Sequence, residues 1–393
     1  MKEGWTYKKL GEVSSFQNGF AFKSNLFRKE GCPIVRISNI QNEEVQTDDI
    51  VYFNKEDYPV NFDNYKIFPN DILIAMSGGT TGKLGINTTN TIFYQNQRVG
   101  VIREDKKTLN HRFLFYFLHT KSEESLKIAA GAAQPNLSTA QIKDFIIPLP
   151  SLSEQQSIVD YLDSAFAKID VMKANAEKAL NEAKSLFQAS LKEMLEPKEG
   201  WITSTLKDEC FKITDGTHQT PKYCQSGYIF LSSKNVTSRK IDWEDVKFID
   251  ESQHQIMHKR VAPQVGDILL AKNGTTGVAA MVDRDVIFDI YVSLALLRSK
   301  GNVTPDYLLA FVNSPIAKEQ FDKRLIGMGV PNLHLGEINK VVITYPIDKE
   351  EQAKVTQRIE ELDNLIIRLQ ENYDKISQEC DALKQAILRQ VFE

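Results

Sequence analysis

Short polar side chains and basic side chains recur together in two parts of this sequence. The candidates in the first part are Asn18, Lys23, Arg36, Ser38, Asn39, Ser77, Thr80 and Lys83, and those in the second are Thr217, His218, Gln219, Lys222, Ser233, Lys234, Lys272 and Asn273. Amide, hydroxyl and imidazole groups can read base edges in the major groove of DNA, and lysine or arginine contacts phosphates. We treat each residue as a candidate for DNA contact, with phosphate contact or plain solvation as its alternatives.

Two other patterns have the residue types of a ligand site but lack its full spacing. The segment 77–83 resembles a phosphate-binding loop, yet that loop requires Gly where Ser77 stands and Ser or Thr where Leu84 stands. It is better explained as a turn that can approach DNA. His254 and His258 have the four-residue spacing of metal ligands on a helix, but no third ligand completes a familiar signature. We expect these two histidines to be solvated and predict no metal.

Catalytic motifs are missing from the sequence. It contains no Asn/Asp-Pro-Pro-aromatic motif that would hold a flipped adenine for methyl transfer, and no glycine-rich cofactor fingerprint. It also contains no convincing acidic cluster with lysine for metal-assisted DNA cleavage. We therefore expect a chain that is not an enzyme by itself and that uses no cofactor.

The elements that would position the polar candidates are written twice in the chain. Lys2-Glu-Gly-Trp5 recurs 196 residues later as Lys198-Glu-Gly-Trp201, and the same shift relates Pro135-Asn-Leu137 to Pro331-Asn-Leu333. The segments Asp-Ile-Leu-x-Ala (71–75) and Gly-Thr-Thr-Gly (79–82) also recur, at 267–271 and, with a gap of one residue, at 274–277. The constant shift predicts two equivalent domains, residues 1–150 and 198–346, followed by helices at 151–197 and 347–393.

Each domain is expected to be mixed α/β. Strands are predicted at 33–37, 71–75 and 341–345, because these short β-branched segments are bounded by Gly, Pro or Asn. Short helices are predicted at 111–119 and 307–313. The Pro-Asn-Leu segments are expected to turn the chain toward each domain's final strand, with a structural duty for Asn136 and Asn332.

The two segments after the domains have heptad spacing that is typical of a coiled coil. The seam is predicted to contain Ile158, Leu162, Ile169, Met172 and Leu186 from the first helix, and Val355, Ile359, Leu362, Ile366, Leu369, Tyr373, Ile376, Leu383 and Ile387 from the second. Antiparallel pairing sets small residues against large ones, for example Ala183 opposite Leu362, although a shift by one heptad stays open. Helices that pack separately on their own domains are the alternative.

Composition and charge fit a cytoplasmic globular protein. The net charge of −4 comes from the two helical segments, whereas the two domains are nearly neutral. The four cysteines include no Cys-x-x-Cys pair, which argues against zinc ribbons and disulfide staples. No apolar run is long enough to cross a membrane, and the first ten residues lack a signal-peptide stretch.

The tandem order resembles the specificity subunit of type I restriction-modification systems. The resemblance covers nearly the whole chain and is carried by the segment 215–221 (Asp-Gly-Thr-His-Gln-Thr-Pro), the duplicated segments above, and Glu-Gln-Gln (154–156) with Glu-Glu-Gln (350–352). It implies two target-recognition domains and an α+β fold in which the two long helices pair as an antiparallel coiled coil with pseudo-twofold symmetry.

The resemblance also implies partners and a target. These are double-stranded DNA read as two half-sites, two methyltransferase subunits, and restriction subunits joined through the complex. The first domain has Gln17-Asn-Gly-Phe-Ala21 where the second has Asp215-Gly-Thr-His218, so the half-sites should differ. Two alternatives remain open, a modification system without a helicase partner and a coiled-coil scaffold whose domains bind protein.

Overall fold

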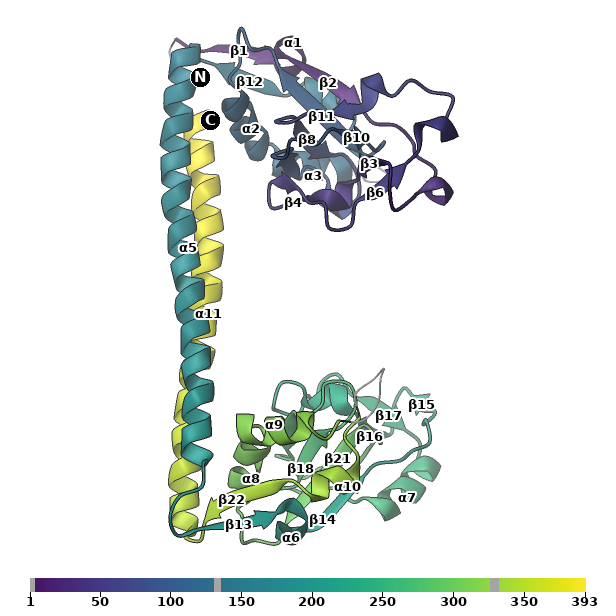
Figure 1. The fold of residues 1–393 in the computed structure, drawn as a ribbon, viewed down its shortest axis with the longest axis vertical. Coiled ribbons are helices and arrows are strands. Elements are labelled where there is room, and N and C mark those ends of the chain that lie inside the picture. Colours follow the sequence, from purple (N-terminus) through teal and green to yellow (C-terminus); the bar gives the residue numbers. More distant parts are fainter. Residues whose placement is uncertain (1–3, 131–135, 326–331) are drawn as a thin grey trace. The chain divides into compact units, whose positions relative to one another are not determined.

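The computed structural model describes residues 4–130, 136–325 and 332–393 of the chain. Their contacts divide the chain into two compact units, one that joins residues 1–175 with 375–393 and one that spans 176–374. Each unit contains one α/β domain together with parts of two long helices, α5 (Leu152–Leu195) and α11 (Lys349–Phe392) (Figure 1). No described helix is long and apolar enough to cross a membrane.

Among its described residues, the first domain contains three sheets and four α-helices. The sheets have the orders β1-β12, β6-β3-β10-β7 and β2-β11-β8-β9-β5-β4. Their strands are β1 (Thr6–Lys9), β2 (Ser14–Asn18), β3 (Cys32–Val35), β4 (Ile40–Gln41), β5 (Glu44–Val45), β6 (Val51–Phe53), β7 (Lys66–Ile67), β8 (Ile72–Ala75), β9 (Leu84–Ile86), β10 (Phe93–Gln95), β11 (Val99–Glu104) and β12 (Ile146–Leu149). The helices are α1 (Leu10–Val13), α2 (His111–Thr120), α3 (Ser122–Ala130) and α4 (Thr139–Lys143).

The second domain repeats this plan, with fewer strands in the part of it that the structure describes. Its sheets have the orders β13-β22, β14-β21-β18-β19 and β15-β17-β16-β20. The strands are β13 (Trp201–Thr205), β14 (Cys210–Asp215), β15 (Tyr223–Cys224), β16 (Tyr228–Leu231), β17 (Lys247–Ile249), β18 (Ile268–Ala271), β19 (Ala279–Met281), β20 (Phe288–Ile290), β21 (Leu294–Ser299) and β22 (Val342–Pro346). The helices are α6 (Leu206–Glu209), α7 (Glu251–Arg260), α8 (Pro305–Val312), α9 (Pro315–Asp322) and α10 (Leu335–Asn339). The mixed α/β prediction is confirmed.

The central strand of each domain explains the uninterrupted apolar segments in the sequence. In β18, Ile268 and Leu270 join a core that includes α8, whereas Leu269 and Ala271 join a second core beneath the other sheet. Successive side chains of a strand point to opposite faces, so a strand buried on both faces must be apolar throughout. Strand β8 of the first domain divides its side chains between two cores in the same way.

A buried glutamine fastens each long helix to its domain. The Gln352 side chain donates to the carbonyls of Asn302 and Pro346, both at 2.9 Å, and accepts from the Thr304 amide at 2.8 Å. Gln155 makes the same three bonds in the first unit, with Thr108, Pro150 and Asn110. The structural counterpart of Gln352 is therefore Gln155, whereas a constant shift of 196 residues points to its neighbour Gln156.

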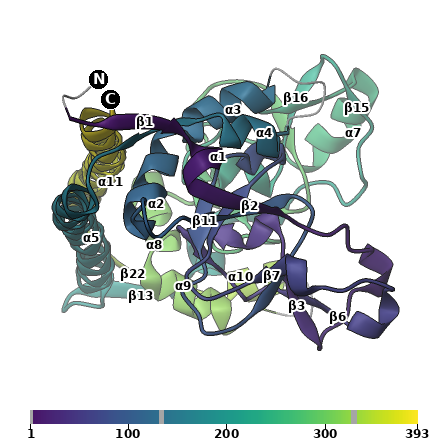
Figure 2. The same ribbon diagram turned by 90° about the horizontal axis from the view of Figure 1, so that it is seen from above.

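Within each unit the long helices lie side by side (Figure 2) and run antiparallel (Figure 1), as expected. In the first unit Lys173 contacts Asp381 at 3.1 Å, and Lys384 contacts Asp170 at 2.6 Å. In the second unit Lys184 contacts Gln370 at 2.7 Å. Gln370 lies about one heptad beyond the expected partner of this turn, so the register is the shifted one that the sequence left open.

Four of the fourteen predicted seam residues are wrong by one residue. The heptad positions that contain Leu162 and Ile169 are buried as predicted, but four predicted seam residues are exposed, namely Met172, Leu186, Leu369 and Leu383. Phe187 is buried in place of Leu186, and Leu180 is a buried residue that the predicted seam did not include. The error arose because apolar residue type was preferred. Partly buried positions such as 173 and 384 instead hold lysines whose stems lie on the seam and whose ammonium groups pair with aspartates.

Candidate nucleic-acid interface

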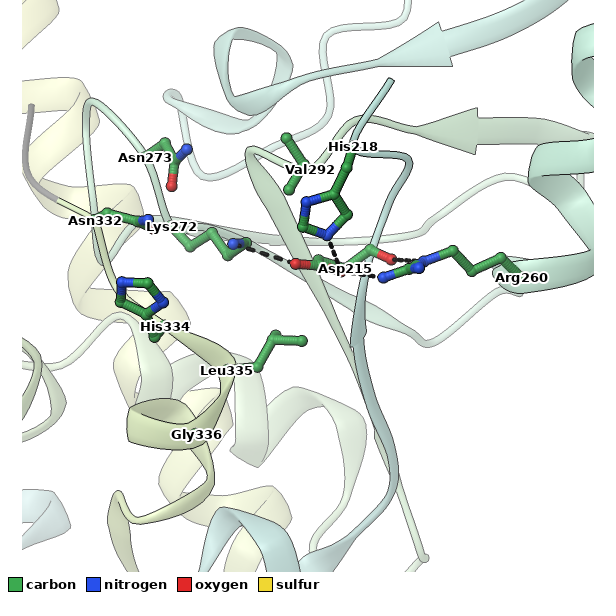
Figure 3. A pocket seen from close by; sticks show the side chains of 10 residues that line it. All are labelled: Asp215, His218, Arg260, Lys272, Asn273, Val292, Asn332, His334, Leu335 and Gly336. Atoms are coloured by element: carbon green, nitrogen blue, oxygen red, sulfur yellow. Dashed lines mark hydrogen bonds and ion pairs between the residues drawn. The ribbon is translucent and has the colours of Figure 1, made fainter. Parts of the chain in front are cut away.

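A hollow in the second domain collects charged and amide side chains from four separate elements. Its volume is about 630 Å³, and it lies beside the carboxyl end of β18 and the start of α10 (Figure 3). The residues around it are Asp215, His218, Arg260, Lys272, Asn273, Val292, Asn332, His334, Leu335 and Gly336. We name this set the second-domain hollow.

Asp215 is the centre of the charge network in the second-domain hollow. Its side chain accepts from Arg260 at 2.7 Å and contacts Lys272 at 3.2 Å, with the exposed His218 imidazole at 3.3 Å (Figure 3). Burial by itself raises the pKa of Asp215, but the hydrogen bonds from Arg260 and Lys272 outweigh it and hold the pKa below its ordinary value. The carboxylate therefore stays ionised and fixes two cationic groups beside the hollow.

Gly216 allows two backbone segments to approach closely directly after Asp215. A Cβ atom at this position would lie 1.8 Å from the carbonyl oxygen of Ile290, a distance that no side chain can accept. Gly19 in the first domain is equally close to the carbonyl of Asn96, at 2.0 Å. Close approach of two backbones explains why glycine follows Asn18 and Asp215 in the two domains.

Two amide side chains of the second-domain hollow have an unused acceptor. The Oδ1 atoms of Asn273 and Asn332 are buried and have no hydrogen-bond partner among the described residues. The two residues form an isolated β-bridge with each other, which sets both amides beside Lys272. Because a buried acceptor without a partner is costly, these atoms indicate a place where a ligand donor completes the structure.

The first domain has unused polar atoms at the matching place. Ser77 forms an isolated bridge with Asn136, as Asn273 does with Asn332. The hydroxyl oxygens of Ser77 and Thr80 are buried without a partner among the described residues. Unsatisfied polar atoms at the end of the central strand are thus common to both domains.

The chemistry around these atoms differs between the domains. The Leu333 amide bonds the carbonyl of Lys272, and the Leu137 amide bonds that of Met76, so Met76 is the counterpart of Lys272. Asn18 pairs with Gly100 on β11, and Asp215 pairs with Ala295 at the same place on β21, so Asn18 is the counterpart of Asp215. The first domain therefore lacks the buried ion pair of the second.

The structure brings only some of the predicted contact residues together. His218, Lys272 and Asn273 line the second-domain hollow, but Lys272 is 5% exposed and paired with Asp215 rather than displayed on the surface. The remaining second-domain candidates lie outside it: Thr217, Gln219, Lys222, Ser233 and Lys234. Gln219, Lys222 and Lys234 are exposed.

The first-domain candidates are more scattered. Ser38 and Asn39 line a small polar hollow with Asp48 and Asp49, and Lys83 is exposed beside a different one. The remaining candidates are Asn18 and Lys23, which are exposed, and Arg36, which donates to the Asp49 carbonyl at 2.9 Å. Asn39 is buried and bonds the Arg36 amide and the Gln46 carbonyl, so it maintains a turn.

Sequence reasoning missed Arg260 and underrated Asn332. Arg260 is 45 residues from Asp215 in sequence, and only the packing of α7 brings it there. Asn332 belongs to a segment that was assigned a structural duty, yet its side-chain oxygen is left without a described partner. Pro135 and Pro331 of the same segments lie outside the described residues.

The expectation of solvated histidines on α7 is wrong for His254. This side chain is buried, and its Nδ1 atom lies 2.7 Å from Asp289 on β20. His258 is partly exposed and lies 3.2 Å from the other oxygen of Asp289. Burial raises the pKa of Asp289, and hydrogen bonds from the two imidazoles offset this only in part.

Comparison with known proteins gives one consistent family. The family described as "Type I restriction modification DNA specificity domain" matches residues 2–182 and again residues 198–378. The EcoKI specificity subunit of Escherichia coli K12 is 25% identical over 422 residues, covering 100% of this chain and 89% of the relative. The MjaVIII specificity subunit of Methanocaldococcus jannaschii is 28% identical over 318 residues, covering 76% and 73%.

Solved structures share the fold at low sequence identity. A chain from the study "Structural basis underlying complex assembly and conformational transition of the type I R-M system" has a TM-score of 0.75 and 18% identity, covering 100% of this chain and 98% of that one. The HsdS subunit from Thermoanaerobacter tengcongensis has a TM-score of 0.55 and 18% identity, covering 99% and 97%.

Proposed function

This chain belongs to the type I restriction modification DNA specificity family, and from that premise we propose that it reads a bipartite target in double-stranded DNA. In this proposal residues 1–150 and 198–346 are the two target-recognition domains. Residues 151–197 and 347–393 are the helices that join them and hold partner subunits. Each domain reads one half-site.

The unused acceptors at the end of each central strand support base reading most directly. Amide oxygens such as those of Asn273 and Asn332 can accept from the exocyclic amino groups of adenine or cytosine in the major groove. Hydroxyl groups at 77 and 80 can do the same in the first domain. The different neighbours of these atoms, Lys272 with Asp215 against Met76 with Asn18, support different half-site sequences.

Two matched substitutions test this assignment. In Asn273→Ala the backbone bridge to Asn332 is retained while the amide is lost, and Ser77→Ala removes the corresponding group of the first domain. Each should relax discrimination at one half-site by roughly 1–3 kcal/mol and leave the other half-site unchanged. Methylation-sensitive sequencing of a host that expresses the complex reports both half-sites. If both variants leave both half-sites intact in assembled complexes, the base-reading role is wrong.

We also propose that the helices present one docking surface twice, for two methyltransferase subunits. Met172 on α5 and Leu369 on α11 are exposed apolar residues related by the same 197-residue offset that relates Gln155 to Gln352. Exposed apolar residues at equivalent positions fit a partner that binds in two copies. Restriction subunits would join through the complex.

The stoichiometry of the purified complex tests this surface. Native mass spectrometry should find two methyltransferases for each specificity subunit. Met172→Glu or Leu369→Glu should reduce the number to one, whereas Glu177→Ala, on an exposed helical position, should retain two. A saturated one-to-one complex with the unaltered chain would contradict the proposal.

No catalytic role is proposed for the chain alone. With S-adenosylmethionine, ATP and magnesium present, the isolated chain should neither methylate nor cleave DNA. Activity that remains after contaminating subunits have been removed would contradict this.

A further inference from the structure

The pair His254 and His258 lies one helical turn apart on α7 and faces a single carboxylate on β20. Nδ1 of His254 is 2.7 Å from one oxygen of Asp289, and Nδ1 of His258 is 3.2 Å from the other. The potential ligand atoms of these three residues all lie within 4.8 Å of one another. No residue of this group belongs to the second-domain hollow.

Packing holds the group in place before any ligand arrives. Asp289 is 1% exposed and His254 is 9% exposed. The Tyr228 ring stacks on the His254 ring at 3.7 Å with an angle of 8° between the planes, which fixes the imidazole orientation. His258 remains partly open to solvent, so one side of the group is accessible. Ligands on a helix and a strand, supported by a stacked ring, form a preorganised site.

The charge on Asp289 is compensated differently from the other buried aspartates of this domain. Asp215 has Arg260 and Lys272, and Asp267 has Arg298 at 2.6 Å. Among the described residues, the ion-pair partners of Asp289 are the two histidines alone. Imidazoles do not carry a fixed positive charge near neutral pH, unlike guanidinium or ammonium groups. A buried carboxylate in such surroundings is stabilised by an added cation.

We propose that His254, His258 and Asp289 bind a transition-metal ion of the zinc class. Two imidazole nitrogens and one carboxylate oxygen suit Zn²⁺ or Co²⁺, whereas Mg²⁺ and Ca²⁺ prefer oxygen ligands throughout. The ion would lie about 2.0–2.2 Å from each ligand atom. Small side-chain rotations that open the present hydrogen bonds provide this spacing. Water on the exposed side of His258 completes the coordination.

Such an ion would tie α7 to β20, the strand that lies against the backbone directly after Asp215. Ile290 follows Asp289, and its carbonyl accepts from the Thr217 amide at 3.1 Å and lies against Gly216. Arg260, the partner of Asp215, is on the same helix as both histidines. An effect of the ion on half-site reading rests on the proposed function, but metal binding itself does not.

Titration of the full-length chain with Co²⁺ tests the site without DNA. Tetrahedral or five-coordinate Co²⁺ with nitrogen and oxygen ligands gives visible absorption bands, and we expect saturation at one ion per chain, followed by displacement with Zn²⁺. His258→Gln and Asp289→Asn should abolish the bands. Cys224→Ser, which removes an exposed thiol in the same domain, should leave them unchanged.

The outcomes separate a metal site from a hydrogen-bonded cluster. Asp289→Asn keeps the side-chain shape, and His258 is accessible enough for its glutamine variant to fold if the aspartate variant does not. Zn²⁺ should also raise the melting temperature of the unaltered chain and fail to do so in either variant, because a ligand of the folded state alone stabilises it. Weak or absent Co²⁺ binding at neutral pH, or bands that survive both variants, would overturn the proposal.

Discussion

Gln352→Ala should loosen the junction between the second domain and α11. The glutamine side chain satisfies three backbone groups, the carbonyls of Asn302 and Pro346 and the amide of Thr304. Thr304 is also the N-cap residue of α8, so the change strikes the start of that helix. At about 1 kcal/mol for each buried group left without a partner, the loss is about 3 kcal/mol or more.

Hydrogen exchange of the α8 amides measures this loss locally, because junction opening need not unfold the whole chain. Gln352→Met fills much of the side-chain volume without restoring the polar contacts, so it should lose most of the stability that Gln352→Ala loses. The alanine variant should lose more because it also leaves a cavity. Gln357→Ala removes an exposed i,i+4 contact with Glu361 on the same helix and should change little. The variant Gln155→Ala should have the corresponding effect on the first unit alone.

If Gln352→Ala changes α8 exchange by less than tenfold, or less than about 1.4 kcal/mol, the reasoning is refuted. In that case either water replaces the side chain or the apolar contacts of Val355 and Ile359 with the domain core hold the junction without it. An equal loss in Gln357→Ala would point to a general weakening of α11 rather than to the buried contacts of Gln352.

Three further predictions concern the second domain and the helices. Gly216→Ala should destabilise the second domain by about 3 kcal/mol or more, because the new Cβ atom would meet the Ile290 carbonyl. Gly336→Ala should be neutral or stabilising, because no atom lies within 4 Å of the new Cβ atom. Thermal unfolding of the two variants compares these effects. Because the pKa of Asp215 is lowered in the folded chain, its stabilising contribution is complete above the ordinary value of 3.8 and is lost as the pH falls through the lower folded value. Asp215→Asn should therefore weaken the pH dependence of the unfolding free energy below about pH 4. An unchanged pH dependence in this range would contradict the prediction. One heptad added to each of α5 and α11 should lengthen the spacer between half-sites by about 10 Å, or roughly three base pairs, with the half-sites unchanged; methylation of the original spacing by such a complex would show that the helices do not set it.

Much of the fold could be predicted because the repeat and the periodic apolar residues are local signals. The strand at 71–75 appears as β8, and the helix at 111–119 appears as α2 (His111–Thr120). The seam prediction was wrong at four positions, in part because Lys173 and Lys384 can lie at an interface through their aliphatic stems, which residue type alone does not reveal.

The site was less predictable because its residues meet only through tertiary packing. Arg260 and Asp215 come from α7 and β14, and neither their spacing nor their types indicate the contact. The burial of Lys272 follows from an ion pair across strands, whereas lysine is usually exposed. The sequence did not indicate a third residue for the pair His254 and His258, because Asp289 lies 35 residues beyond His254 in the chain.

The strands that open and close each domain have a consequence for how these proteins can diversify. β1 pairs with β12 from Thr6 opposite Leu149 to Lys9 opposite Ile146, and β13 pairs with β22 in the same way. The chain thus enters and leaves each domain on adjacent antiparallel strands, about 5 Å apart. Such a domain can be exchanged as a unit, because its two ends fit any chain that offers the same pair of adjacent attachment points. Recombination at these strands could exchange a whole domain between related chains without redesigning the helices that carry it, and joining the two ends by a short turn should yield circular permutants that still fold.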